Sequence, residues 1–420
     1  MFPADFTLAY PIVVKKEMEV YLARQPIFSK NKKVYGYELL FRGGMSNAFP
    51  DIDGNTATSK LISNSFLSIG IERITGRKPA FINFTEDLLI KRIPLLLPKE
   101  RVFVEVLEDV EPTEEVINAC REITQKGFRI ALDDFFYRAE LEPLIALADT
   151  IKFDLRLTLI DELAEDVEKL SKHNVNLLAE KVETYEEFSR AVGIGFTLFQ
   201  GYFFSKPEMI AGRDVSSSQM NLLEIMAEAN KEDVSFGRLE EVIERDVSIS
   251  YKLLRYINSV YFRRVNEISS IRQAIVLLGE KEIRRFLSLI AMAQLASGKP
   301  DELIRTSIIR AKFCELLGKA SDVRIDSSEL FTLGLFSLID AVMDDSMEDL
   351  MGKIPLSEKI KQALVSGKGK ISHYLKLAVS YEKGEWESVA RLVDLTGVNE
   401  EDIPHYFMMA LEWADSFAAI

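Results

Sequence analysis

Short apolar runs alternate with amphipathic segments up to about Pro207, and this alternation constrains the fold more than any other feature. The apolar runs are VYGYELLF, PAFINF, RVFVEVLE, RIALDDF, TIKFDL, VNLLAEKVE and LFQGYFF. Between several of them lie helix-like stretches such as TSKLISNSFLSIG and PTEEVINACREITQKG, the second bounded by Pro112 and Gly127. Alternating strands and helices predict a parallel sheet, and about eight units over roughly 200 residues favour a closed (β/α) barrel of the TIM type. An open doubly wound sheet is the alternative, but no glycine-rich phosphate loop follows a strand.

A helical pattern replaces the strands from about Gln219 onward. Apolar residues recur at three- to four-residue spacing in MNLLEIMAEA, LEEVIERD, SYKLLRYINSVYF, SIRQAIVLLG, IRRFLSLIAMAQLAS and SELFTLGLFSLIDAVMD. Gly279 closes the fourth segment, where a C-terminal helix cap is expected. The sequence therefore predicts a barrel domain over residues 1–208, a linker over residues 209–217 and an all-helical domain over residues 218–420.

Composition limits the classes of partner. The 420 residues carry a formal net charge of −14, whereas proteins that bind nucleic acids or anionic membranes need a basic surface. No apolar stretch reaches the roughly 18 to 20 residues that span a bilayer, and no basic segment precedes the apolar run at the N-terminus. We therefore expect a cytoplasmic protein with neither nucleic-acid nor membrane partners. Cys120 and Cys314, far apart in helix-like segments, are expected to be reduced structural thiols.

Polar side chains gather where the predicted strands end. They are Glu38, Asn83, Glu105, Asp133, Asp134, Lys152, Asp154, Glu180, Glu183 and Gln200. In a (β/α) barrel the carboxyl ends of the strands meet at one mouth, where the chemistry takes place. Crowded carboxylates raise one another's pKa unless cations bind among them, and their hard oxygen atoms suit Mg²⁺ or Mn²⁺. The adjacent pair Asp133 and Asp134 could serve two such ions, which together could cleave a phosphodiester.

Seven motifs, in this order along the chain, resemble those of the EAL domains that hydrolyse cyclic di-GMP. YGYELLFR is similar to the motif that names the family, FINF supplies its asparagine, and EVLE is similar to E-x-T-E. DDFF, IKFD, AEKVET and FQGYFFSKP follow, so that the likeness covers about residues 17–208. The resemblance implies two Mg²⁺ or Mn²⁺ ions in the barrel. It implies ligands Glu38, Asn83, Glu105 and Asp133 for one ion, and Asp133 and Asp134, with Glu180 nearby, for the second.

The same resemblance implies roles for further residues. Lys152 would orient or activate the attacking water, with Glu180 beside it, and Glu183 and Gln200 would support the site. Arg42 would contact a phosphate of the expected ligand, cyclic di-GMP. Glu108 would anchor the loop that follows Asp134.

Two departures from the family pattern concern turnover. Where the family has a glycine and small residues after D-D-F, this chain reads FYRAE from Phe136 to Glu140. Because that loop couples metal binding to dimerisation in the family, both turnover and a homodimer stay open. Lys181 replaces a family glycine, and either neutralises a carboxylate and weakens the second metal site or points into solvent.

The helical half resembles the HDOD domain, a relative of metal-dependent HD phosphohydrolases. The likeness covers about residues 218–295 and includes Asp246, the pair Asn258 and Ser259, and the pair Leu278 and Gly279. HD hydrolases bind metal through a His-Asp pair and further histidines. None of the three histidines, His173, His373 and His405, precedes an aspartate, and Ser337 and Leu338 stand where that pair would fall. We therefore expect no metal in this domain, and a role in binding an unidentified protein partner.

Three functions are compatible with a barrel of this kind. The first is a bacterial signalling protein whose EAL domain is a metal-dependent cyclic di-GMP phosphodiesterase of low activity, coupled to an HDOD interaction domain. The alternative is a non-catalytic receptor for cyclic di-GMP or a scaffold for a partner protein. A retaining glycosidase would also place glutamates at a barrel mouth, but the aromatic platforms usual in sugar sites are lacking there, since Trp386 and Trp413 both lie in the helical half.

Overall fold

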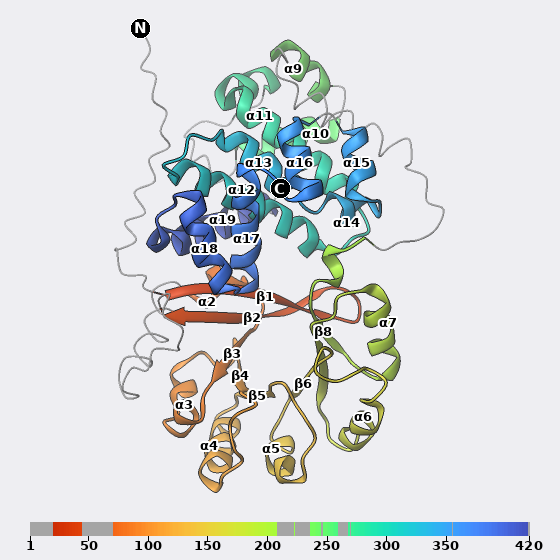
Figure 1. Cartoon of the computed structure of the whole chain (residues 1–420), viewed down its shortest axis with the longest axis vertical. Helices are drawn as coiled ribbons and strands as arrows, with labels where there is room; N and C mark the ends of the chain where they lie inside the picture. The colour runs from red at the N-terminus through yellow and green to blue at the C-terminus, as the bar shows by residue number, and fades with distance from the viewer. Residues whose placement is uncertain are drawn as a thin grey trace.

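The computed structural model describes residues 20–43, 70–207, 222, 236–244, 247–258, 268, 270–354 and 356–418. Within these residues the chain forms a barrel and an all-helical domain, which lie one above the other in Figure 1. The expected helix TSKLISNSFLSIG, apart from its last residue, falls outside the described residues. So do Asp246, Ser259 and all of MNLLEIMAEA except Leu222.

Eight strands close the barrel in the order in which they occur along the chain. The strands are β1 (Val20–Ser29), β2 (Val34–Gly43), β3 (Ala80–Phe84), β4 (Val102–Val106), β5 (Arg129–Leu132), β6 (Thr150–Asp154), β7 (Asn176–Glu180) and β8 (Leu198–Gln200). The helices are α2 (Ile71–Thr75), α3 (Glu86–Ile90), α4 (Glu114–Gln125), α5 (Glu142–Ile145), α6 (Ala164–Leu170) and α7 (Tyr185–Ile194), with 3-10 turns η1 (Ile93–Leu96), η2 (Ala139–Leu141) and η3 (Phe203–Ser205). The predicted closed barrel is therefore confirmed.

The direction of the first strand differs from the parallel sheet that the sequence predicts. β1 pairs antiparallel with both β2 and β8, whereas the pairs from β2 to β8 are parallel. A tight turn joins β1 to β2, with the Ser29 amide donating to the Lys33 carbonyl at 2.9 Å. A turn of this length permits only an antiparallel pair, because parallel neighbours need a long crossover. The apolar pattern missed β1 because Arg24, Gln25 and Pro26 interrupt it.

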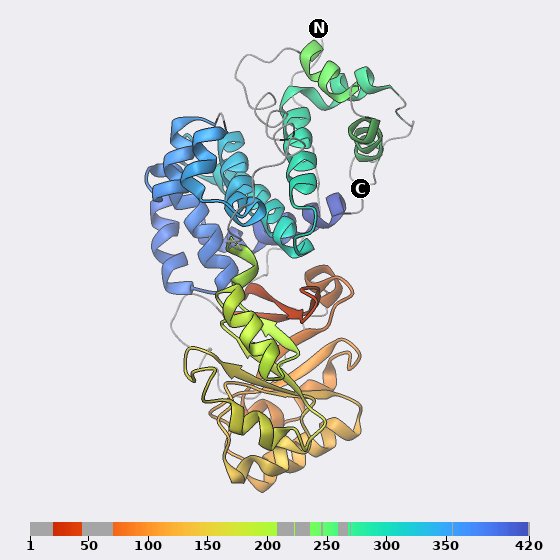
Figure 2. The same cartoon turned by 90° about the vertical axis from the view of Figure 1, so that its right-hand side faces the viewer.

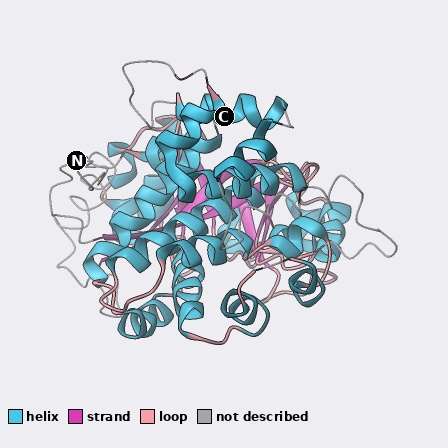
Figure 3. Cartoon of the chain, turned by 90° about the horizontal axis from the view of Figure 1, so that it is seen from above, coloured by secondary structure: helices cyan, strands magenta, loops and turns pink. Residues whose placement is uncertain are grey.

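The helical domain follows the barrel, and in the view of Figure 3 its helices lie over the strands. Its helices are α9 (Phe236–Glu244), α10 (Val247–Ile257), α11 (Ile271–Leu295), α12 (Asp301–Ala320), α13 (Ser327–Phe336), α14 (Ile339–Met343), α15 (Met347–Lys353), α16 (Glu358–Ser366), α17 (Lys370–Lys383), α18 (Trp386–Thr396) and α19 (Ile403–Ala418), with the 3-10 turn η5 (Glu400–Asp402). Gly279 breaks α11 with a φ of 78°, as its predicted capping role requires. Cys120 and Cys314 are buried free thiols, as expected. No described helix combines the length and the hydrophobicity that a membrane crossing requires.

The β1–β2 hairpin contributes to the contact between the two domains (Figure 2), together with α2, which packs against α19. The Tyr21 hydroxyl donates to Glu400 Oε1 at 2.6 Å, and its ring packs edge-on against Trp386 at a centroid distance of 5.9 Å. The Tyr37 hydroxyl donates to Glu302 Oε2 at 2.9 Å, and Arg24 Nη2 lies 3.7 Å from Glu302 Oε1. The hairpin thus presents one face to the barrel and polar side chains to the helices.

The buried carboxyl of Glu302 predicts a pH dependence of stability. Burial raises the pKa of Glu302 to about 7, although Arg24 and the Tyr37 hydroxyl oppose the rise. The folded protein therefore holds this proton more tightly than the unfolded chain, so the stabilising contribution is complete below pH 4.5 and is lost as the pH rises to about 7. The loss is at most about 3 kcal/mol. Denaturant titrations from pH 5 to 7.5 should show a steeper fall for wild type than for Glu302→Gln, and parallel curves would contradict this interpretation.

Gly201 allows the segment that follows β8 to pack closely against the segment that follows β7. Its φ is 145°, and a Cβ there would lie 2.1 Å from the Val182 carbonyl oxygen and 2.4 Å from the Val182 nitrogen. Gly201→Ala is therefore expected to destabilise the protein by at least about 3 kcal/mol in chemical denaturation. Gly193→Ala, in α7 and with no atom within 4 Å of the added Cβ, is the matched control. It should stabilise by about 0.5 to 1 kcal/mol, and an equal loss in both variants would contradict the steric explanation.

Candidate metal centre at the barrel mouth

A polar layer lies directly above an apolar layer inside the barrel. The apolar layer contains Ile27, Phe81, Phe103, Ala131, Leu178 and Leu198. Residues two apart on a strand face the same side, so the next inward layer toward the carboxyl ends of the parallel strands is polar. This layer contains Asn83, Glu105, Asp133, Glu180 and Gln200, with Glu38 from β2 and Lys152 from β6. The structure thus brings the side chains of these strand-end residues together.

The Lys152 ammonium lies among four carboxylates. Its Nζ is 2.6 Å from Glu180 Oε1, 2.7 Å from Asp133 Oδ1, 2.8 Å from Glu105 Oε1 and 3.7 Å from Glu38 Oε2. Complete burial disfavours the charge, but the surrounding carboxylates outweigh burial and raise the pKa of Lys152 well above its ordinary value. Lys152 is therefore a permanent cation at the centre of the mouth.

Negative charge remains in excess around this cation. Burial, with the charges of Glu38 and Asp133, raises the pKa of Glu105 well above its usual range although Lys152 opposes the rise. Burial also raises the pKa of Glu180 to about 8. The raised pKa values of Glu105 and Glu180 mean that these buried carboxyl groups resist ionisation. The single ammonium of Lys152 therefore supplies too little positive charge for the whole cluster.

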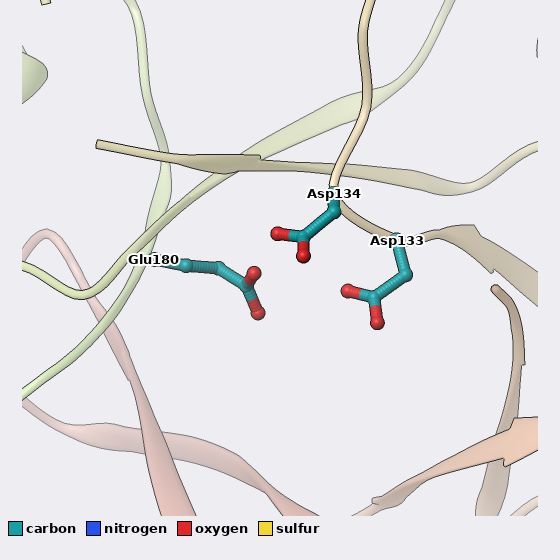
Figure 4. A group of neighbouring side chains, drawn as sticks. All are labelled: Asp133, Asp134 and Glu180. Carbon is teal, nitrogen blue, oxygen red and sulfur yellow. The ribbon is translucent and has the colours of Figure 1, made fainter. Parts of the chain in front are cut away.

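Asp133 and Asp134 share one side of the chain because the backbone turns between them. Consecutive residues of a strand normally face opposite sides, but Asp134 has a φ of 37°, a left-handed conformation that aspartate tolerates. The carboxylates of Asp133, Asp134 and Glu180 consequently point toward one another (Figure 4), with an oxygen of each within 4.8 Å of the others. This arrangement explains how an Asp-Asp pair at a strand end can serve one site.

Several oxygen atoms of the mouth are buried without a hydrogen-bond partner among the described residues. They are Asn83 Oδ1, Glu105 Oε2, Asp134 Oδ1 and Gln200 Oε1. Leaving such atoms unpaired is costly in a protein interior, unless a ligand completes them. Hard oxygen donors from carboxylates and amides are the ligands that Mg²⁺ and Mn²⁺ take, so the residues present fit a divalent ion.

Two amides hold the Glu38 carboxylate in place. Asn83 Nδ2 donates to Glu38 Oε1 at 3.3 Å, and Gln200 Nε2 donates to Glu38 Oε2 at 2.6 Å. Gln200 Nε2 also donates to Gln25 Oε1 at 2.9 Å. Gln25 escaped the sequence analysis together with β1. The turn-rich segment SKNKK between two β-rich runs was the signal for a hairpin that could have revealed it.

Lys181 lies beside the carboxylate cluster and pairs with Asp154, which lies at the edge of that cluster. Its Nζ forms an ion pair with Asp154 Oδ2, while its side chain remains 56% exposed. Partial burial lowers the pKa of Lys181, but the hydrogen bond to Asp154 and the charges of Asp154, Asp134 and Glu180 together outweigh burial and raise this pKa. Lys181 therefore neutralises a carboxylate, that of Asp154, and also remains partly in solvent, so that it combines features of both expected orientations. Its backbone φ of 54° lies in the left-handed region, which glycine adopts without strain and lysine does not.

Of three further residues expected at the site, one lies away from it, one lines a cavity together with the loop that follows Asp134, and one has its side chain outside the described residues. Glu183 is half exposed and pairs with Lys206 at 3.0 Å, so the structure places it outside the carboxylate cluster. Glu108 is exposed and lines a cavity of about 310 Å³ shared with Asp133, Asp134 and Arg138. Arg42 belongs to β2, but its side chain falls outside the described residues.

Comparisons with known proteins agree with both halves of this architecture. The EAL domain model matches residues 55–207, and the HDOD domain model matches residues 217–357. The chain belongs to the family of proteins that join an EAL domain to an HDOD domain. The class expected from the motifs is thereby confirmed.

Two relatives match along nearly the whole chain. Cyclic di-GMP phosphodiesterase CdgJ of Vibrio cholerae is 38% identical over 397 residues, which cover 94% of this chain and 92% of that protein. The protein YuxH of Bacillus subtilis is 37% identical over 404 residues, which cover 94% and 98%. Among solved structures, the BlrP1 complex with calcium and cyclic di-GMP from Klebsiella pneumoniae is 21% identical, with a TM-score of 0.38 over 46% of this chain and 57% of that chain.

Proposed function

We propose that this protein hydrolyses cyclic di-GMP with divalent metal ions held at the barrel mouth, and that its HDOD domain binds a protein partner in signalling. The observation that carries the proposal is the ring of buried carboxylate and amide oxygens around the mouth, several without a hydrogen-bond partner among the described residues. The relative named as a cyclic di-GMP phosphodiesterase, similar over 94% of this chain, supports the choice of substrate.

The residues of the mouth divide into two ligand sets in this proposal. Glu38, Asn83, Glu105 and Asp133 would hold one Mg²⁺ or Mn²⁺ ion, and Asp133 and Asp134, with Glu180 nearby, would hold the second. When bound, such ions neutralise the phosphodiester and make water a stronger nucleophile. The HDOD domain would hold no metal.

The protein's own side chains position the reactants. Lys152, fixed by Glu105 and Asp133, donates a hydrogen bond to the attacking water and keeps it directed at phosphorus. Arg42 contacts a phosphate of the dinucleotide. A bond then forms between the water oxygen and phosphorus and one P–O bond of the ring breaks. One proton of the water ends on the released ribose oxygen as its hydroxyl, and a linear dinucleotide with a terminal phosphate results. Gln200 and Asn83 keep Glu38 oriented throughout.

Product analysis tests this function. Full-length protein is incubated with cyclic di-GMP and Mn²⁺ or Mg²⁺, and the nucleotides are separated by chromatography. The linear dinucleotide should accumulate with either metal and should be absent with EDTA. Binding of cyclic di-GMP without any product would support a receptor instead, and absence of binding would leave the role of a partner-protein scaffold.

The ion pair between Lys181 and Asp154 favours the receptor as the second candidate, because it places a cation beside Asp134 and Glu180. If this cation slows turnover, Lys181→Gly should raise both Mn²⁺ affinity and hydrolysis. One charge interaction near the surface is worth on the order of 1 kcal/mol, or about fivefold. Lys181→Gln removes the charge but keeps the left-handed backbone under strain, so it should match the glycine variant in affinity and not in thermal stability. Unchanged affinity in both variants would show that Lys181 has no influence on the site.

A further inference from the structure

We infer that Gln25 is a positioning residue that connects the helical domain to Glu38, so that docking of the helical domain on the barrel favours the metal-binding arrangement of the mouth. The inference rests on the proposed function in one respect, that Glu38 is a metal ligand.

Three hydrogen bonds in series link the two domains through Gln25. Gln25 Nε2 donates to the carbonyl oxygen of Lys383, the last residue of α17, at 3.2 Å. Gln200 Nε2 donates to Gln25 Oε1 at 2.9 Å and to Glu38 Oε2 at 2.6 Å. The main chain of the helical domain is therefore two side chains away from a candidate metal ligand.

The direction of β1 is what brings Gln25 to the mouth. Gln25 lies opposite Glu38 in the β1–β2 pairing, and Ile27 lies opposite Gln200 in the β1–β8 pairing. Because β1 runs antiparallel to its neighbours, the residue two positions before Ile27 continues the inward face toward the mouth. A parallel first strand would have pointed this position toward the opposite end of the barrel.

The Lys383 carbonyl sets the orientation of both amides. A carbonyl can only accept a hydrogen bond, so the Gln25 amide must turn its nitrogen toward α17 and its oxygen toward Gln200. Gln200 then uses its nitrogen on Gln25 and Glu38. Its Oε1 is left buried at the mouth without a hydrogen-bond partner among the described residues, where this oxygen can act as a ligand for a cation. Without the carbonyl, the Gln25 amide could rotate by 180°, Gln200 could follow it, and Gln200 would then lose its hydrogen bond to Glu38.

The same end of α17 touches two further points close to the site. Lys383 Nζ lies 4.8 Å from the ring centroid of Tyr202, two residues after Gln200. Gly384 packs so closely on Leu40, two residues after Glu38, that an added Cβ would lie 3.0 Å from Leu40 Cδ1. The end of α17 thus contacts Gln25 and, in addition, residues close to Glu38 and Gln200 in the chain.

Because binding equilibria are linked reciprocally, the connection can be measured through metal affinity and through the docking of α17. If docking of α17 favours metal binding, metal binding must favour docking of α17 by the same factor. A protein that binds the HDOD domain and draws α17 away from β1 would then weaken metal binding in the barrel.

The first measurement is the Mn²⁺ affinity of full-length variants by calorimetry. Gln25→Met keeps the length of the side chain and removes both hydrogen bonds, and it should weaken Mn²⁺ binding about three- to tenfold, the usual range for one lost hydrogen bond. Tyr21→Phe is the matched control, because it loses the bond to Glu400 in the same domain contact without touching Gln200. Its affinity should stay within about twofold of wild type. Wild-type affinity in Gln25→Met would overturn the inference.

Hydrogen exchange supplies the reverse measurement and does not depend on a variant that folds. In wild type, Mn²⁺ should slow exchange in the segment 381–389 at the end of α17, and leave α16 unchanged. The slowing should disappear in Gln25→Met. Equal exchange with and without Mn²⁺ in wild type would overturn the connection, whereas failure of wild type to bind Mn²⁺ at all would overturn the proposed function and this inference with it.

Discussion

Replacing Lys152 by methionine is expected to destabilise the metal-free protein by about 3 to 5 kcal/mol, the usual cost of removing one partner from a buried ion pair. The ammonium lies within 2.8 Å of oxygens of Glu105, Asp133 and Glu180, and these groups would lose their common counter-charge. Mn²⁺ should restore much of the lost stability, because an ion that binds only the folded state stabilises it. Hydrolysis should fall at least about 100-fold even with Mn²⁺, because no ammonium remains to orient the water.

Chemical denaturation with EDTA and with Mn²⁺ measures the stability change, and Lys312→Met is its control. Lys312 is also a largely buried lysine beside a carboxylate, 3.1 Å from Glu315 and with its side chain 12% exposed, but it lies in the helical domain. Glu315 keeps Arg285 at 2.9 Å and an ion pair with Lys319, so this loss should be smaller and should not respond to Mn²⁺. A Lys152→Met protein as stable as wild type in EDTA would contradict the charge assignment of the mouth.

Asp133→Asn is expected to abolish hydrolysis, with a loss of at least about 1,000-fold, while the fold is retained. Asp133 belongs to both proposed ligand sets and lies 2.7 Å from Lys152 Nζ. Replacing one carboxylate of a crowded group by an isosteric amide lowers the repulsion in the metal-free state, so the melting transition should stay cooperative. Mn²⁺ titration and product chromatography measure the two effects.

Glu183→Gln provides the matched comparison for Asp133→Asn. The family resemblance implied that Glu183 supports the site, but its side chain is 51% exposed and pairs with Lys206. We expect hydrolysis within about threefold of wild type, as for most exposed ion pairs that contribute little. Equal losses in the two variants would mean that the functional site extends to Glu183.

The strand-end residues could be predicted from the sequence because a (β/α) barrel leaves little freedom in where they lie. Once Phe81 and Phe103 face the interior, alternation along each strand forces Asn83 and Glu105 into the next layer. No comparable rule applies to β1, since Arg24, Gln25 and Pro26 break its apolar pattern. Those polar residues make sense only beside the helical domain, which a local pattern cannot reveal.

Side-chain directions after the strands could not be predicted either. Lys181 follows Glu180 directly, yet its left-handed backbone and its partner Asp154, on the neighbouring strand β6, decide where its ammonium lies. Glu183 occupies its expected place in the motif, but motif order does not determine whether a side chain turns toward the mouth or toward Lys206. In both cases a residue from a distant part of the sequence decides the outcome.

Manganese bound at the barrel mouth can be located directly by anomalous X-ray diffraction from crystals of the full chain grown with Mn²⁺. We expect anomalous peaks at coordination distance, about 2.1 Å, from carboxylate oxygens of Asp133 and its neighbours Glu38, Glu105 or Asp134. No peak is expected among the helices from α9 to α19. A barrel mouth without manganese, or manganese bound only in the helical domain, would contradict the assignment of the strand-end carboxylates as the metal centre.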